Sequence, residues 1–258
     1  MEKDENILLI DKPAGWTSFD VVAKIRGKIR AEYAKKNVKP TKKQLRVGHA
    51  DTLDPFATGL LIILLGESCK KAGEFLKLDK QYEFTAKLGQ VSSTGDTEGE
   101  ILDYRSQNLD LRKSKEGNVA VIPVKTGIQS LKYEGSESNN HPTIDEVNQA
   151  LKQFEGEITQ IPPAFSAIKI NGQRAYKLAR EGKEVVVPPR QVTVNNIELI
   201  EYNFPYLKCR CDVSSGTYIR TLVEDIGRKL NTGAYCIELR RTKIDNYCIE
   251  NVQSIDKI

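Results

Sequence analysis

The chain has 258 residues, of which 39% are hydrophobic and 29% charged, which is typical of a globular protein long enough to bury a sizeable core. Its longest apolar stretch is far shorter than the roughly 20 residues of a membrane-spanning helix, and the charged start MEKDEN lacks the apolar segment of a signal peptide. We therefore expect a cytoplasmic protein that has no membrane partner.

The basic side chains are concentrated in one segment, although the formal net charge is only +4. Residues 24–46 contain ten Lys or Arg and a single acidic residue, Glu32. Such a block favours a polyanionic partner, and the alternative is a solvated helix face followed by a loop. The chain has five cysteines without a CxxC pair and only two histidines, so we expect neither a disulfide framework nor a metal site.

The first half of the chain predicts a short strand over 7–10 and a helix that begins at Thr17 or Ser18 and runs to about Arg30. The loop Gly48–Gly59, reading GHADTLDPFATG, then leads into the apolar run Leu60–Leu65. This run needs burial on both faces and is predicted to be a central strand. A loop at the end of such a strand commonly presents functional groups, which makes Asp54 the first candidate for chemistry and Asp51 its rival.

The middle of the chain predicts a helix over Glu67–Lys77 with Leu76 facing inward, and a half-buried strand over 82–88. A short strand is expected at 101–104. Residues 106–141 lose all periodicity and are predicted to form a surface insertion. Thr143 and Glu146 then make a capping box that opens a helix ending near Phe154.

The remaining segments are predicted to be short strands and two helices. The helices are expected over 173–181 and 221–230, and the strands over 185–187, 192–194, 207–213 and 234–241. Strands and helices are mixed without regular alternation. This favours an α+β fold over a doubly wound sheet, and we expect one catalytic domain over 1–258.

Six separated segments resemble one family, the TruB-type tRNA pseudouridine synthases. They are DKPAGWTSFD, GHADTLDPFATGLL, KQYEFTAKLG, IPPAFSAIKINGQRAYKLAREG, SSGTYIRTLVEDIG and LRR, and they occur in the family's order from about residue 7 to 241. Asp51 departs from the family pattern, which has a glycine or other small residue there. Because the sequence ends at Ile258, we also expect it to lack the small C-terminal RNA-binding (PUA-like) domain that is common in bacterial members.

The resemblance implies a mixed, mainly antiparallel sheet flanked by helices, and isomerisation of the uridine at position 55 in the T loop of tRNA. The base must leave its stack before it can be reached. Asp54 in TLDP matches the family's catalytic aspartate, Arg220 its arginine partner, and Tyr82 the residue that stacks on the flipped base. No cofactor or metal is required. We expect the protein to act as a monomer on the T arm.

Four further residues receive roles from the same resemblance. His49 lies near the vacated stack, Tyr218 manages the proton on carbon 5, Leu239 forms a pocket wall, and Lys12 grips phosphate together with the basic block. Taken alone, Tyr82 and Leu239 are also consistent with plain core positions. Two other functions stay open, a tRNA-folding chaperone that lost turnover through Asp51, and a nucleoside hydrolase that uses Asp54 with water.

Overall fold

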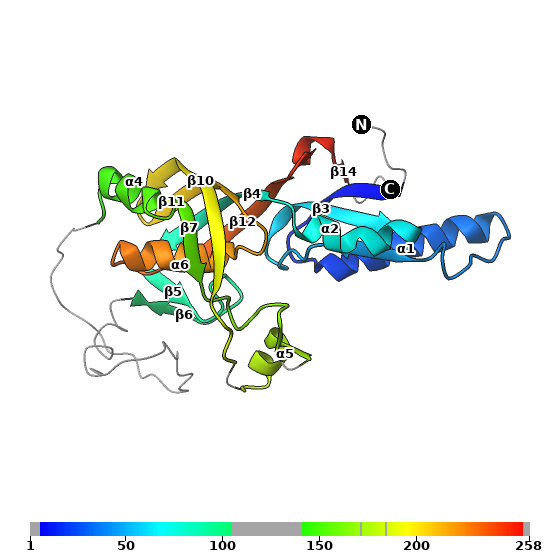
Figure 1. Cartoon of the computed structure of the whole chain (residues 1–258), viewed down its shortest axis with the longest axis horizontal. Helices are drawn as coiled ribbons and strands as arrows, with labels where there is room; N and C mark the ends of the chain where they lie inside the picture. Colours follow the sequence, from blue (N-terminus) through cyan, green and yellow to red (C-terminus); the bar gives the residue numbers. More distant parts are fainter. Residues whose placement is uncertain (1–5, 105–140, 171, 184, 255–258) are drawn as a thin grey trace.

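A computed structural model describes residues 6–104, 141–170, 172–183 and 185–254 of the chain. It has the predicted α+β class, because one large, mostly antiparallel sheet carries helices that do not alternate with its strands. The sheet runs along the length of the molecule, with α1 and α2 near one end and α4 and α6 near the other (Figure 1). The predicted insertion at 106–141 lies, except for His141, outside the described residues.

The large sheet has a strand order that brings the two ends of the chain together at one edge. Only the pairs β1–β14 and β3–β12 are parallel among the described strands. The order is β14 (Gln253–Ser254), β1 (Ile7–Lys12), β3 (Thr58–Leu65), β12 (Ala234–Ile244), β4 (Lys80–Leu88), β11 (Tyr206–Val213), β10 (Arg190–Asn203) and β7 (Gly156–Gln160), with β2 (Val47–Ala50) beside β3 and β13 (Tyr247–Cys248) beside β12. Two small hairpins are β5 (Gln90–Ser92) with β6 (Ile101–Asp103), and β8 (Lys169–Ile170) with β9 (Gln173–Arg174).

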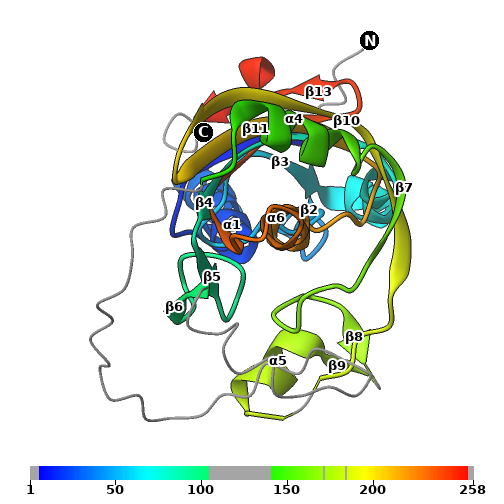
Figure 2. The ribbon, with the colours of Figure 1, turned by 90° about the vertical axis from the view of Figure 1, so that its left-hand side faces the viewer.

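The helices begin where side chains can satisfy their first free N–H groups. Thr17 caps α1 and Thr143 caps α4, and each forms a capping box with the acidic residue three positions later. Figure 2 shows the sheet arching over α6. The helical segments are α1 (Ser18–Lys35), η1 (Gly66–Lys71), α2 (Ala72–Leu76), α4 (Ile144–Lys152), α5 (Ala175–Arg180), α6 (Ile219–Lys229) and η2 (Ile249–Asn251).

Strand β3 is buried on both faces, as its apolar run predicts. Leu61 and Ile63 pack with α1, whereas Leu60, Ile62 and Leu64 pack on the opposite face against Phe75 and β12. A third cluster joins β4, β11 and β12 to α4 and α6, and the cysteines of β11 lie within it, fully buried. The strand that follows the loop at 51–57 is therefore fixed from both sides, which gives that loop a rigid base.

Several elements differ from the prediction. Residues 47–50 form β2 rather than part of a loop, β7 was not predicted, and 185–187 form no strand. Strand β10 instead continues for 14 residues, because pairing with both β7 and β11 satisfies its backbone even where its side chains are polar. Leu76 is 47% exposed, so its predicted inward position is wrong. No helix in the described parts of the chain is long and apolar enough to cross a membrane.

Candidate active site

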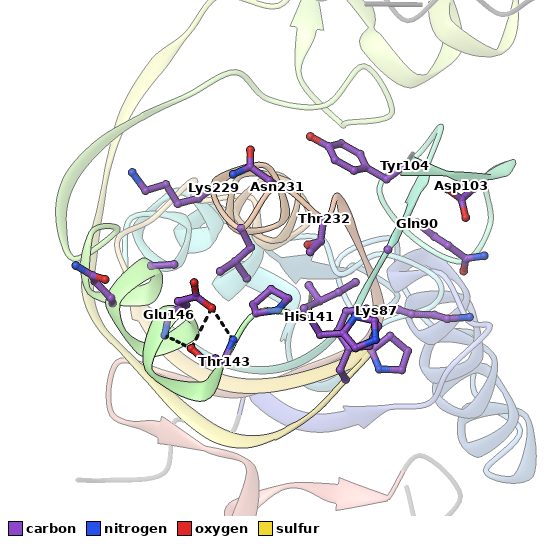
Figure 3. A pocket seen from close by; sticks show the side chains of 18 of the residues that line it. Lys87, Gln90, Asp103, Tyr104, His141, Thr143, Glu146, Lys229, Asn231 and Thr232 are labelled. Carbon is purple, nitrogen blue, oxygen red and sulfur yellow. Dashed lines mark hydrogen bonds between the residues drawn. The ribbon is translucent and has the colours of Figure 1, made fainter. Parts of the chain in front are cut away.

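Two hollows lie toward opposite ends of helix α6. The larger, of about 840 Å³, lies between α4 and the C-terminal end of α6 and is lined by His141, Glu146 and Lys229 among others (Figure 3). Of its two acidic side chains, Asp103 and Glu146, the carboxylate of Glu146 accepts hydrogen bonds from the Thr143 N–H and hydroxyl at the start of α4. None of the predicted site residues lines this hollow.

The smaller cavity, of about 460 Å³, collects the predicted site residues. It opens where the loop between β2 and β3 meets the start of β4 and the turn that precedes α6. Lys12 is the one residue of the predicted set that does not line it. The predicted residues in its lining are His49, Asp54, Tyr82, Tyr218, Arg220 and Leu239.

The central contact of this cavity is an ion pair between Asp54 and Arg220. The Asp54 Oδ2 lies 2.9 Å from the Arg220 Nε, and the Asp54 side chain is 35% exposed whereas that of Arg220 is 4% exposed. Arg220 also donates from Nη1 to the Thr94 carbonyl and from Nη2 to the Phe165 carbonyl, each at 2.9 Å. The guanidinium is thus fixed from several sides, while the carboxylate stays open to the cavity.

Asp96 is a second carboxylate at Arg220 that the sequence analysis missed. Its Oδ2 lies 3.2 Å from the Arg220 Nη1, and the residue is 4% exposed. The other oxygen accepts from the Thr94 hydroxyl at 2.5 Å and from the Glu98 N–H at 3.0 Å. Asp96 therefore pairs with the Nη1 group of Arg220, while the Nε group of the same guanidinium faces Asp54.

Burial raises the pKa of Asp54, and the Arg220 guanidinium acts in the opposite direction. Asp96 adds to the rise because a second negative charge nearby disfavours ionisation. Arg220 is therefore the main group that favours a charged Asp54, and Lys12 makes a smaller contribution in the same direction. The charged carboxylate can then stabilise or attack a developing positive centre.

Lys12 does not occupy the surface position that a phosphate contact needs, which corrects the expectation from the sequence. It is fully buried, and its Nζ donates to the carbonyls of Pro13, Trp16 and Pro55 at 2.9, 2.7 and 3.2 Å. Burial lowers its pKa to about 8, partly opposed by Asp54. Lys12 instead ties the turn at 13–16 to the residue that directly follows Asp54.

The aromatic and apolar side chains around Asp54 come from elements that are distant from it in the sequence. Tyr82 on β4 is 7% exposed and Leu239 on β12 is also 7% exposed, and both reach the cavity. Burial raises the pKa of Tyr82 to about 12 and lowers the pKa of His49, which favours the neutral forms of both. A flat apolar surface beside a carboxylate suits an aromatic base.

Asp51 faces a different cation from Asp54. Its backbone is left-handed, with φ of 68°, a conformation that aspartate tolerates better than most residues. The carboxylate lies 2.9 Å from the Nη1 of the fully buried Arg241 and 3.6 Å from the Nζ of Lys80. Asp51 therefore compensates two buried cations, and its place in the loop has a structural reason.

No group of three or more His, Cys, Asp or Glu side chains in the described ranges is arranged to hold a metal ion. Several buried polar groups around the cavity are available to hydrogen-bond a polar ligand. Buried side-chain atoms of His49, Ser166 and Arg190 have no hydrogen-bond partner among the described residues, and all three residues line the smaller cavity. Unsatisfied buried groups are uncommon and gather at functional sites.

The fold is shared with chains of two solved assemblies. One belongs to the "Crystal Structure of a Cbf5-Nop10-Gar1 Complex", with a TM-score of 0.60 and 25% identity over 97% of this chain and 54% of that chain. The other belongs to the "Structure of H/ACA RNP bound to a substrate RNA containing 2'-deoxyuridine", with a TM-score of 0.58, 23% identity and coverage of 97% and 51%. These matches assign the chain to the class of proteins that have the pseudouridine-synthase fold.

Sequence comparison gives the family. Residues 35–122 and 119–219 match the TruB family pseudouridylate synthase N-terminal domain, and 220–257 match the tRNA pseudouridylate synthase B C-terminal domain. The "tRNA pseudouridine synthase B" of Parabacteroides distasonis is 38% identical over 98% of this chain and 91% of its own length. That of Aquifex aeolicus is 37% identical over 98% of this chain and 73% of its own. The chain belongs to the TruB family of pseudouridylate synthases.

Proposed function

We propose that this protein converts the uridine at position 55 in the T loop of tRNA into pseudouridine, acting as a monomer. The observation that carries the proposal is the Asp54–Arg220 ion pair, which lies in the wall of a cavity that Tyr82, Tyr218 and Leu239 also line. Family membership supports the reaction, and relatives named tRNA pseudouridine synthase B support the substrate.

The reaction begins when the target base leaves the RNA stack and enters the cavity, at a cost of a few kcal/mol. Tyr82 then stacks on the uracil, a contact that contributes about 1–3 kcal/mol. His49, whose Nδ1 is buried without a partner among the described residues, lies on β2 at the side of the same cavity. We assign it a position beside the stack that the base has left.

Asp54 acts when the bond between base and ribose breaks. Positive charge then develops on the sugar, and the carboxylate either stabilises it, attacks the sugar carbon or removes a neighbouring proton. The uracil turns, and its carbon 5 bonds to the ribose carbon that its nitrogen has left. Tyr218 accepts the proton that carbon 5 must lose, and the ring nitrogen that has left the ribose gains a proton, so that the product has the same atoms as the substrate.

The surface that binds the phosphates is assigned to the C-terminal part of α1 and the loop after it, rather than to Lys12. Seven basic side chains there are exposed, and together they form the basic patch: Arg30, Lys35, Lys36, Lys39, Lys42, Lys43 and Arg46. Contacts of this kind position RNA without reading its sequence, and they release counterions on binding. RNA affinity should therefore fall steeply as salt rises, measured by filter binding from low to physiological salt.

The test of the reaction uses T-arm RNA that carries tritium on carbon 5 of its uridines. Pseudouridine formation releases tritium from the target uridine only, so we expect one equivalent of label to enter the solvent and none from an RNA with cytidine at that position. Retention of all label would refute the enzyme and favour a tRNA-folding chaperone. Release of free uracil would indicate a nucleoside hydrolase instead.

A further inference from the structure

We propose that Gln160 and Arg190 are positioning residues that hold Tyr218 in the active-site cavity. They are directly opposite each other in the antiparallel pair of β7 and β10. Both contact Tyr218, the residue at the start of α6. Gln160 forms hydrogen bonds with the main chain of Tyr218, and Arg190 lies over its ring. The inference rests on the proposed function, in which Tyr218 faces carbon 5 of the flipped base.

Gln160 forms hydrogen bonds with both polar groups of the Tyr218 main chain, the N–H and the carbonyl. Its Oε1 accepts from the Tyr218 N–H at 3.0 Å, and its Nε2 donates to the Tyr218 carbonyl at 3.3 Å. The same carbonyl accepts the N–H of Leu222, so Gln160 is attached to the first turn of α6. Gln160 is 1% exposed, and a buried amide that satisfies two main-chain groups fixes them strongly.

Arg190 covers the ring of the same tyrosine. Its guanidinium carbon lies 4.6 Å from the centre of the Tyr218 ring, within the range of a cation–π contact. Its Nε and Nη2 are buried and have no hydrogen-bond partner among the described residues. Leaving such donors unpaired costs stability. We infer that this cost is accepted because the guanidinium contacts the Tyr218 ring and faces the cavity, instead of forming a salt bridge.

The turn before Tyr218 is shaped to let Arg190 approach. Gly216 has a φ of 82°, which disfavours other residues, and a Cβ at this position would lie 3.1 Å from the Arg190 Nη1. Ser214 anchors the same turn to β10, since its N–H donates to the Thr193 carbonyl and its hydroxyl accepts the Thr193 N–H, both at 2.8 Å. Hydrogen bonds therefore attach the turn that carries Tyr218 to both strands, through Ser214 to β10 and through Tyr218 itself to β7.

The consequence is that the phenol has one location relative to Asp54. A proton acceptor displaced by about 1 Å can lower a rate about a hundred-fold without weakening substrate binding. Loss of either contact should therefore lower turnover and leave RNA affinity nearly unchanged.

The experiment compares Gln160→Met and Arg190→Met with two matched controls. Gln191→Met makes the same change from glutamine to methionine at the residue that follows Arg190 on β10. The side-chain amide of Gln191 accepts a hydrogen bond from Thr159 and makes none with Tyr218. Arg180→Met removes a similar contact between an arginine and a tyrosine ring, that of Tyr176, whose ring centre lies 5.7 Å from the Arg180 guanidinium carbon. We expect turnover to fall about 10- to 100-fold in both test variants, with the RNA dissociation constant within about three-fold, and no change in the controls.

A second readout reports on Tyr218 without relying on activity. Fluorotyrosine is placed at position 218 alone, and its fluorine NMR signal is recorded in each background. A single narrow signal is expected in the parent and in both controls, and a shifted or broadened one in Gln160→Met and Arg190→Met. An unchanged signal in both test variants overturns the inference, whatever happens to turnover. Arg190→Met keeps this test available if Gln160→Met does not fold, because Arg190 is only half-buried and makes no ion pair among the described residues.

Repeating both changes in a Tyr218→Phe background separates the inference from the proposed function. If both act through the phenol, their effect on turnover should nearly vanish there, since residues that act as a unit are not additive. Undiminished losses in that background would contradict the inference. Full activity of Tyr218→Phe itself would instead remove the proposed role of Tyr218 as the proton acceptor, and the fluorine signal would still decide whether Gln160 and Arg190 hold the ring.

Discussion

Arg220 and Arg241 are both buried guanidinium groups, and the loop between β2 and β3 supplies an aspartate to each of them. Arg220 meets two carboxylates, Asp54 and Asp96, and so has an excess of negative charge. Arg241 shares its one carboxylate, Asp51, with Lys80, and so has an excess of positive charge. The comparison shows that one short loop can serve a reaction at one aspartate and the fold at another.

The sharpest way to test this comparison is the same substitution at both aspartates. Asp54→Asn should lower turnover by about a thousand-fold, because an amide cannot supply the charge that the breaking bond requires. RNA affinity should stay within about three-fold, since the basic patch lies elsewhere. Single-turnover tritium release and filter binding measure the two quantities, and an equal loss of affinity would show that Asp54 has been misplaced.

Asp51→Asn should instead act on stability. It removes the carboxylate that compensates Arg241 and Lys80, and breaking such a buried pair costs about 3 kcal/mol. Asp245→Asn is a suitable control, because Asp245 is also left-handed, with φ of 48°, but exposed. Urea unfolding measures the difference. A variant that is as stable as the parent would contradict the structural role of Asp51, and higher turnover in Asp51→Gly would revive the chaperone reading.

Asp96→Asn should give an intermediate effect at the Arg220 centre. Arg220 keeps Asp54 but loses its second carboxylate, so the Nε edge is held less firmly toward the cavity. We expect turnover to fall about 10- to 100-fold, the range of a misplaced catalytic group. Asp103→Asn, an exposed change on the neighbouring β6, serves as the control. Equal rates for the two variants would show that Asp96 does not position Arg220.

The smallest effect is expected from Glu224, which lies one turn after Arg220 on α6. Burial raises its pKa to about 7 from an ordinary value of 4.5, with the charge of Asp225 adding to the rise. A carboxyl with a raised pKa contributes stability below the unfolded pKa and loses it as the pH rises to about 7. Glu224→Gln should therefore flatten the dependence of the melting temperature on pH between about 4.5 and 7. An unchanged pH profile would contradict this assignment.

Most elements of the fold follow from local patterns. The all-apolar run at 60–65 predicts a strand buried on both faces, and the alternation at 82–88 predicts β4. The capping residue Thr17 or Ser18 predicts the start of α1, and the capping box of Thr143 and Glu146 predicts the start of α4. Among the missed elements, β2 and β7 are short segments with glycine and polar residues. Their strand conformation comes from pairing with neighbours that are distant in sequence, which no local pattern contains.

The candidate site divides in the same way. Asp54 stands out in the sequence because it precedes a buried strand, and the motif series links it to Arg220 by resemblance. Asp96 lies in a polar turn among other acidic and hydroxyl residues, and nothing in its spacing marks it. The buried position of Lys12 was equally hidden, since a lysine in a turn ordinarily faces water.

The sequence by itself determined the family, the class of fold and the loop that carries the carboxylate, because these depend on motifs and on periodicity along the chain. Only the tertiary structure decided which aspartate meets which arginine, and that Gln160 and Arg190 meet at Tyr218. Those contacts join strands and turns far apart in the chain. Charge compensation in a buried site depends on distance in space, and the folded sheet sets that distance.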